Sequence, residues 1–160
     1  MSKAHYYHSH IRWEGNLGNG TAAQDSYSRN FIAKVAGKVD LKASADSAFQ
    51  GDGGRWNPED MLLTAVAAGH KLRYLHLCAL NKVKVLAYSD LAEAMMDEGD
   101  PQRPGHFCYV RLSPQVVIDA NSSLELALAL HEEASRLCFM ANSLNCPVRC
   151  EPKISQEKAA

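Results

Sequence analysis

The fold is decided by one stretch of the sequence, Asn57-Pro-Glu-Asp-Met-Leu-Leu-Thr-Ala-Val-Ala-Ala-Gly-His-Lys-Leu-Arg-Tyr-Leu-His-Leu-Cys-Ala-Leu80. Its start predicts a helix, because Asn57 is a favourable N-cap residue and Pro58 fits the first helical position. Glu59 and Asp60 place negative charge at the positive end of the helix dipole. The residues that follow are apolar on nearly every side, whereas a surface helix would have one apolar stripe. We therefore expect a long central helix that is buried all round.

The segments on either side of this helix predict strands and one further helix. Before it, strands are expected at 5–13 and 26–35, with a short segment within 37–48. After it, alternating apolar and polar residues predict long strands at 82–95 and 107–118 and a short one at 146–154. A second helix is expected from Leu124 to about Ser143, capped by Asn121 or Ser122. This order predicts an α+β fold in a single domain over residues 1–160, with a polar tail from about residue 155.

Composition and charge narrow the function classes. The chain has 160 residues, of which 46% are hydrophobic and 22% are charged, as in an ordinary soluble domain. Its formal net charge of −1 gives no electrostatic reason to expect a nucleic acid or a membrane as partner. No apolar run is long enough for a transmembrane helix and no signal-peptide core is present, so we expect a cytoplasmic protein. The odd number of cysteines, 5, favours reduced thiols over a disulfide scaffold.

Three motifs together resemble a known family. They are Asn57-Pro-Glu-Asp-Met-Leu-Leu with Ala67-Ala68, Tyr88-Ser-Asp-Leu-Ala-Glu93, and Cys146-Pro-Val-Arg. Their order and spacing are similar to those of the OsmC/Ohr family, the osmotically inducible and organic hydroperoxide resistance proteins. The resemblance covers nearly the whole chain and implies antiparallel sheets packed around the buried central helix in an intertwined homodimer with two interface sites. It also implies reduction of organic hydroperoxides at the expense of a dithiol reductant, with no metal, haem or other cofactor.

The site residues of the family map only partly onto this chain. The resemblance places Cys146 at the family's resolving cysteine and Glu59 at the glutamate that orients an arginine, for which Arg29 is the candidate. The family's reactive cysteine would stand at position 69, where this sequence has Gly69. Because glycine has no side chain, the ordinary two-cysteine cycle is not available. Three other cysteines are interpreted as packing or surface residues: Cys78, Cys108 and Cys138. Cys150 is too far along an extended strand from Cys146 for a disulfide unless the chain bends, and the roles of all four stay open.

Two polar residues that follow Gly69 are candidates for a pocket. His70 and Arg73 lie on the predicted central helix, together with Lys71. A cation on an apolar helix needs an anionic partner or a path to water, because an unpaired buried charge is very costly. We therefore expect Gly69, His70 and Arg73 to line the mouth of a pocket or the dimer interface.

The histidines do not predict a metal site. His70 and His76 are six residues apart, and two ligands on one face of a helix need a spacing of three or four. A Zn²⁺ site assembled from His70, Cys146 and Cys150 stays open as an alternative. His131 is interpreted as part of a solvated helix face, because the second histidine of a zinc-protease motif is absent.

The residues leave two main functions open. In the first, the protein is a thiol-dependent peroxidase of reduced or altered activity, with Cys146 as the nucleophile and Arg29 and Glu59 in support. In the second, a non-catalytic homodimer binds an apolar small molecule in an interface pocket that Gly69 widens. A structural or regulatory dimer without a ligand is a third reading. The accessibility of the Cys146 thiol discriminates between the first two.

Overall fold

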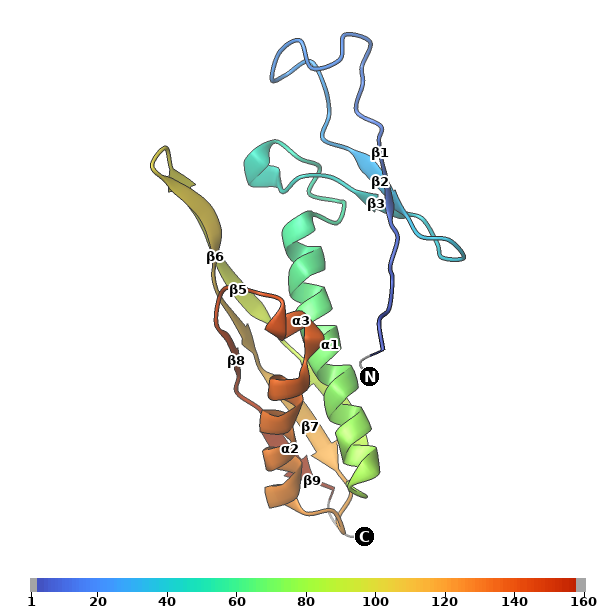
Figure 1. The fold of residues 1–160 in the computed structure, drawn as a ribbon, viewed down its shortest axis with the longest axis vertical. Coiled ribbons are helices and arrows are strands. Elements are labelled where there is room, and N and C mark those ends of the chain that lie inside the picture. The colour runs from blue at the N-terminus through green and yellow to red at the C-terminus, as the bar shows by residue number, and fades with distance from the viewer. Residues whose placement is uncertain (1–2, 158–160) are drawn as a thin grey trace. The chain divides into compact units, whose positions relative to one another are not determined.

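The computed structural model describes residues 3–157 of the chain. Its elements follow the order strands, long helix, strands, helices and strands (Figure 1), which confirms the predicted α+β class. Contacts between residues divide the chain into two compact units, Met1–Leu62 and Leu63–Ala160.

A three-stranded antiparallel sheet forms the regular part of the first unit. Its order is β1 (His10–Trp13), β2 (Phe31–Lys34) and β3 (Leu41–Ala43). These strands are shorter than the predicted segments at 5–13, 26–35 and 37–48. One reason is a tight turn at Gly37, whose φ of +75° favours glycine and ends the pairing between β2 and β3. A short 3₁₀ helix, η1 (Ser47–Phe49), follows.

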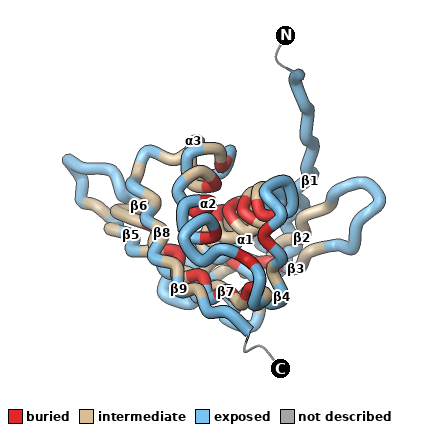
Figure 2. The backbone as a smooth tube through the Cα atoms, turned by 90° about the horizontal axis from the view of Figure 1, so that it is seen from below, coloured by how far each residue is buried: buried red, intermediate tan, exposed pale blue. Residues whose placement is uncertain are grey.

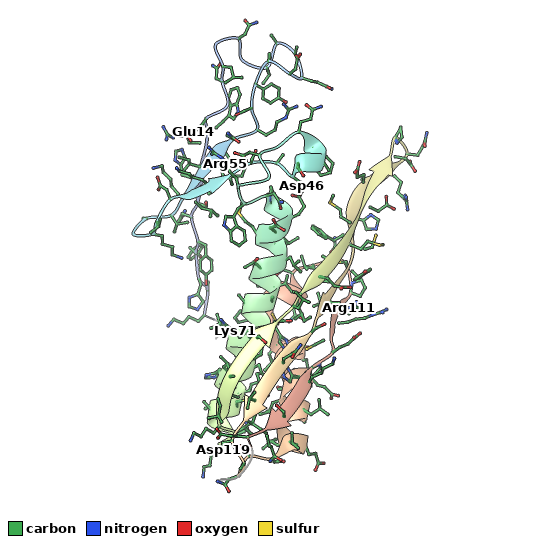
Figure 3. All side chains as sticks on the ribbon, turned by 180° about the vertical axis from the view of Figure 1, so that it is seen from behind. Glu14, Asp46, Arg55, Lys71, Arg111 and Asp119 are labelled. Carbon is green, nitrogen blue, oxygen red and sulfur yellow. The ribbon has the colours of Figure 1, made fainter. Side chains whose placement is uncertain are left out.

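The helix α1 (Pro58–Leu80) has the predicted bounds. Asn57 caps it as expected, because its Oδ1 accepts a hydrogen bond from the backbone N–H of Asp60 at 2.7 Å. The side-chain amide of Asn57 also donates to Asp46 Oδ2 at 3.2 Å, and Asp46 is labelled in Figure 3. The cap therefore fixes the start of the helix and the loop that leads into it.

Burial on α1 is concentrated along one side (Figure 2). The buried residues recur every four positions and are Val66, His70, Tyr74 and Cys78. By contrast, Leu72 is 64% exposed and Leu80 is 67% exposed. The single chain therefore covers one side of α1, and burial of the other side by a partner chain stays a prediction.

The second unit contains two three-stranded sheets. One has the order β4 (Val85–Asp90), β7 (Pro114–Ile118) and β9 (Lys153–Gln156). The other has the order β5 (Glu93–Asp100), β6 (Arg103–Leu112) and β8 (Val148–Cys150). The sequence predicts three single strands after α1, at 82–95, 107–118 and 146–154. Each of these segments is two strands in the structure, one in each sheet. The predicted polar tail begins later than residue 155, because Ser155 pairs with Val117 in β9.

The breaks between these strands have local causes. Asp90, at the end of β4, accepts a hydrogen bond on Oδ1 from the backbone N–H of Ser113 at 2.8 Å. This contact joins the break after β4 to the break after β6. Between β8 and β9, Pro152 has no N–H to donate to a strand ladder. The alternation of apolar and polar residues continues through these positions, so it does not show where one strand ends and the next begins.

The sheets of the second unit require one correction to the predicted antiparallel pairing. β4 pairs with β7 and β5 pairs with β6 in the antiparallel sense, as predicted. However, β8 adds to β6 and β9 adds to β7 in parallel. The chain reaches β8 and β9 only after a helical crossover, and a crossover connection is what parallel neighbours need.

The predicted second helix is interrupted near its end. Helix α2 (Leu124–Leu137) begins after Ser123, whose Oγ accepts a hydrogen bond from the N–H of Leu126 at 3.1 Å. The predicted cap at Asn121 or Ser122 is therefore wrong, because the Ser122 hydroxyl bonds Lys84 and Asp119 instead. Cys138 then takes an extended backbone conformation (φ −76°, ψ 112°) and separates α2 from α3 (Phe139–Asn142). The interruption turns the chain, so the residues of α3 meet α1 at Gly69.

The main core of the second unit joins α1, α2 and the sheet that contains β4, β7 and β9. Its buried residues are Tyr74, Cys78, Val83, Val116, Ile118, Ala127, Leu130 and Ala134. A smaller cluster consists of Val66, Val110 and Leu112. Among the described residues, no helix combines the length and the apolar composition that crossing a membrane requires.

Candidate functional site

Position 69 on α1 leaves no free space for a side chain. A Cβ added to Gly69 would lie 2.9 Å from Met140 Cγ and 3.3 Å from Cys138 Sγ. The segment after α2 therefore occupies the place into which a side chain at position 69 would project. The thiol of Cys138 lies beside this space.

A cavity of about 410 Å³ lies next to Gly69. Its lining comes from α1 and from the junction of α2 with α3: Gly69, Leu72, Arg73, His76, Cys138, Phe139 and Met140. The guanidinium carbon of Arg73 lies 5.3 Å from the centre of the Phe139 ring, a cation–π distance. An apolar cavity with one fixed cation suits a small amphipathic molecule.

Cys146 lines a different cavity. It lies in the turn before β8, is half-buried and packs against the cluster of Val66, Val110 and Leu112. The cavity beside it, of about 320 Å³, is also lined by His106 and Cys108. The structure therefore places Gly69 and Cys146 in separate surroundings within the second unit.

Arg29 and Glu59, the predicted supporting pair, make no ion pair with each other in residues 3–157. The guanidinium of Arg29 donates to Gln50 Oε1 at 2.7 Å and to the carbonyl of Tyr27 at 3.0 Å, and it lies over the Tyr27 ring. Glu59 Oε2 is buried without a hydrogen-bond partner. Their roles in a site stay predictions.

His70 does not line the cavity beside Gly69. Its side chain is buried together with His131 from α2 and Cys150 from β8. His70 Nε2 lies 3.0 Å from His131 Nδ1 and 3.4 Å from Cys150 Sγ. Cys150 Sγ lies 3.9 Å from His131 Nδ1, so the three atoms face one another. We call these three residues the His–His–Cys cluster.

Burial controls the protonation of this cluster in the free protein. Loss of solvation lowers the pKa of His70 to about 4. Burial, together with the neighbouring His70, lowers the pKa of His131 to about 3. Burial also raises the pKa of the Cys150 thiol to about 12. At neutral pH all three side chains are therefore uncharged.

The interpretation of His131 as a solvated residue is wrong. It is only 2% exposed, and the Tyr74 ring stacks on it with 3.6 Å between ring centres. The spacing of apolar residues held the signal, because His131 falls between Leu130 and Ala134 on the buried side of α2. Of the residues in the open Zn²⁺ alternative, the structure brings His70 and Cys150 together, with His131 in the place proposed for Cys146.

Solved structures share this fold over nearly the whole chain. An OsmC-like protein of unknown function from Vibrio cholerae matches with a TM-score of 0.84 at 23% identity, over 94% of this chain and 100% of its own. An organic hydroperoxide resistance protein OsmC from Legionella pneumophila matches with a TM-score of 0.69 at 17% identity, over 96% and 99% of the two chains. The organic hydroperoxide resistance protein OhrB of Bacillus subtilis matches with a TM-score of 0.65 at 15% identity, over 93% and 98%.

The sequence itself identifies the family. No curated protein matches the chain. The family model described as OsmC-like protein, however, matches residues 51–153, which include α1, the strands β4 to β8, α2 and α3. The match and the shared fold lead to the same conclusion, which the three sequence motifs had indicated: the chain belongs to the OsmC-like protein family.

Proposed function

We propose that this protein acts in the oxidative-stress response as a thiol-dependent reductase of organic hydroperoxides, with Cys138 in place of a nucleophile on α1. One observation carries the proposal. The Cys138 thiol lies 3.3 Å from the point where a Cβ at position 69 would be. A sulfur atom is thus available next to the position of the family's reactive cysteine, although a different element supplies it.

The cavity beside Gly69 supports an organic rather than an inorganic peroxide as substrate. Leu72, Phe139 and Met140 provide an apolar lining for the organic group. Arg73 in the same lining provides donors for the peroxide oxygens and for the negative charge that develops on the leaving oxygen.

The reaction conserves atoms and electrons in two stages. The Cys138 thiolate attacks the outer oxygen of the hydroperoxide and the O–O bond breaks, which yields a sulfenic acid and an alkoxide that takes up a proton to become the alcohol. An external dithiol then attacks the sulfenic sulfur and releases water. Its second thiol displaces Cys138 from the mixed disulfide, so the dithiol is oxidised and the enzyme is restored.

A non-catalytic binding function is the second candidate. It is favoured by the same apolar cavity and by the near-complete burial of Cys138, whose side chain is 2% exposed. In this case the cavity holds an apolar molecule without turnover, and the thiol contributes only to packing.

A homodimer is part of the proposal. Leu72 on α1 and Phe139 on α3 both line the cavity and are 64% and 73% exposed. A second copy of the chain covering these residues would close the cavity from solvent, as a site for an apolar substrate requires.

The test measures consumption of cumene hydroperoxide with dihydrolipoamide as reductant. We expect turnover by the wild type, loss of turnover in Cys138→Ser, and retention in Cys108→Ser, a matched thiol variant on β6. Dimedone labelling after one addition of peroxide should place the sulfenic acid on Cys138 by mass spectrometry. Light scattering on the same samples should give the mass of two chains.

The other outcomes are equally informative. Loss of turnover only in Cys146→Ser, with the label on Cys146, would transfer the nucleophile to the residue predicted from the sequence. An inert wild type whose fluorescence or melting temperature responds to cumyl alcohol would favour the binding function. An inert wild type without any response to the alcohol would reject both.

A further inference from the structure

The His–His–Cys cluster has the composition of a metal site. Two imidazole nitrogens and one thiol sulfur, each from a different element, have their donor atoms within 4.8 Å of one another. His70 and His131 are 1% and 2% exposed, so their side chains are held by the core and do not move freely. Imidazole and thiolate are the ligands that zinc prefers in proteins.

The distances within the cluster fit tetrahedral coordination. Zn–N bonds of about 2.05 Å and a Zn–S bond of about 2.3 Å, at tetrahedral angles, place two nitrogens about 3.3 Å apart and a nitrogen and a sulfur about 3.6 Å apart. The observed separations are 3.0 Å between the nitrogens, and 3.4 and 3.9 Å from the nitrogens to the sulfur. One ion could contact all three atoms after shifts of a few tenths of an ångström.

Hydrogen bonds alone satisfy this arrangement poorly. If His70 Nε2 carries its proton and donates to His131 Nδ1, it has no lone pair left for the Cys150 thiol. The Cys150 thiol is then left with two hydrogen-bond partners, the Ser135 hydroxyl and His131 Nδ1, which lies at 3.9 Å and already accepts one bond. A cation uses the lone pairs of all three atoms together. The Tyr74 ring stacks on His131 with an angle of 13° between planes and restricts the movement of the imidazole.

A nearby acidic residue would balance the charge. A Zn²⁺ ion with one thiolate leaves one positive charge in the core, and an unpaired buried charge is costly. The carboxylate of Asp90 at the end of β4 acts electrostatically on Cys150. Its Oδ2 is buried without a hydrogen-bond partner. The second unit therefore holds an acidic side chain of which one oxygen, Oδ1, is bonded to the N–H of Ser113 and the other is left to balance the charge of an ion.

We propose that His70 Nε2, His131 Nδ1 and Cys150 Sγ bind a divalent transition-metal ion of the zinc type. Three protein ligands leave the fourth tetrahedral position to a solvent molecule. Binding displaces the thiol proton of Cys150 to solvent and changes no oxidation state. The site is separate from the cavity beside Gly69, so the proposal does not depend on the hydroperoxide reaction.

The experiment uses the full chain, stripped of metal with a chelator and then titrated with Co²⁺ as a spectroscopic probe. We expect one Co²⁺ per chain, with the intense visible bands of tetrahedral cobalt and a near-ultraviolet band from thiolate-to-metal charge transfer. Cys150→Ser should lose the charge-transfer band, and His131→Gln should lose the tetrahedral bands. Cys108→Ser and His106→Ala, which change a thiol and an imidazole on β6, should keep both.

A second measurement keeps the proposal testable if the variants do not fold. In the wild type, Zn²⁺ should protect Cys150 from alkylation by iodoacetamide, as mapped by mass spectrometry, and leave the labelling of Cys146 unchanged. X-ray absorption of the zinc-loaded wild type should show two nitrogen ligands and one sulfur ligand. Substoichiometric metal after removal of excess Zn²⁺, or protection of Cys146 and not Cys150, would overturn the assignment.

Discussion

Ser122 joins two segments of the second unit through one hydroxyl group. Its Oγ accepts a hydrogen bond from the backbone N–H of Lys84 at 2.9 Å and donates to Asp119 Oδ1 at 2.9 Å. Asp119, labelled in Figure 3, has its pKa held below the ordinary value mainly by this bond. A buried serine thus links the segment before β4 to the turn after β7.

Removing the Ser122 hydroxyl should lower the free energy of unfolding by an amount that depends on pH. In Ser122→Ala the N–H of Lys84 loses its acceptor, so the free energy of unfolding should fall by about 1–2 kcal/mol at neutral pH. The pKa of Asp119 should rise toward its ordinary value. The depressed pKa of Asp119 stabilises the fold only at pH values above the pKa that Asp119 has in the unfolded chain. The difference in free energy of unfolding between Ser122→Ala and the wild type should therefore narrow as the pH falls below about 4.

Urea unfolding at several pH values and the NMR titration of Asp119 check both parts. Ser123→Ala is unsuitable as a control because Ser123 caps α2, whereas Ser155→Ala on β9 removes an exposed hydroxyl. An unchanged Asp119 pKa in Ser122→Ala would contradict the assigned hydrogen bond.

Single residues differ in how far the sequence reveals their role. Asn57 could be assigned as a cap because its effect is local, one hydrogen bond three residues away. The burial of His131 could be inferred from its place between Leu130 and Ala134, but its partners Tyr74 and His70 could not, because they lie on another helix. Gly69 stood out by its alignment with a family motif, but the thiol beside it comes from a break in a later helix that no local pattern marks.

At the scale of elements, α3 can pack closely against α1 because position 69 has no side chain. Met140 Cγ and Cys138 Sγ fill the space that a Cβ would need. A methyl group there must displace Met140, whose side chain is flexible but packed. The close approach of the two elements therefore depends on glycine.

Gly69→Ala should destabilise the protein slightly although alanine is the better helix former. Helix propensity gains about 1 kcal/mol, and crowding against Met140 costs about 2 kcal/mol, so a net loss of about 1 kcal/mol is expected. In a Met140→Ala background the cost should shrink or change sign. Urea unfolding of the wild type, the two single variants and the double variant measures the coupling, with Thr64→Ala on the exposed part of α1 as a propensity control. Equal effects in both backgrounds would show that Met140 does not occupy this space.

The helices were predictable as elements and the strands only as segments. Asn57 marks the start of α1 as predicted, whereas the cap of α2 is Ser123 and not the predicted Asn121 or Ser122. The strands after α1 keep their alternation while they pass from one sheet into the other. The chain passes between the sheets at Asp90, Ser113 and Pro152. The hydrogen bond between Asp90 and Ser113 and the missing N–H of Pro152 fix these positions, and the alternation of apolar and polar residues shows neither.

At the scale of the whole molecule, the two sheets of the second unit are completed by the last strands of the chain. Val110 on β6 pairs with Val148 on β8, and Val116 on β7 pairs with Ile154 on β9. Ile154 also packs against the main core, beside Val116 and Ile118. A defect in β9 should therefore reach the core and not remain at an edge.

Ile154→Asp and Ser155→Asp form a matched pair of adjacent substitutions on β9. Ile154→Asp places a charge against the core and should lower the free energy of unfolding by more than about 3 kcal/mol, or prevent folding. Ser155→Asp changes an exposed position and should stay within about 0.5 kcal/mol of wild type. Thermal unfolding followed by circular dichroism compares the two. A similar effect of both variants would argue that β9 is a dispensable edge strand.

The parallel addition of β8 and β9 also bears on how this protein is made. A ribosome releases the chain from its N-terminus, so β4 to β7 and α2 leave the exit tunnel before the strands that complete both sheets. Until then β6 and β7 each present an unpaired edge beside apolar side chains, a state that favours aggregation or chaperone binding. The second unit can reach its native state only after β8 and β9 have left the tunnel. Translation that stalls just before β8 would therefore yield an aggregation-prone fragment instead of a smaller folded protein.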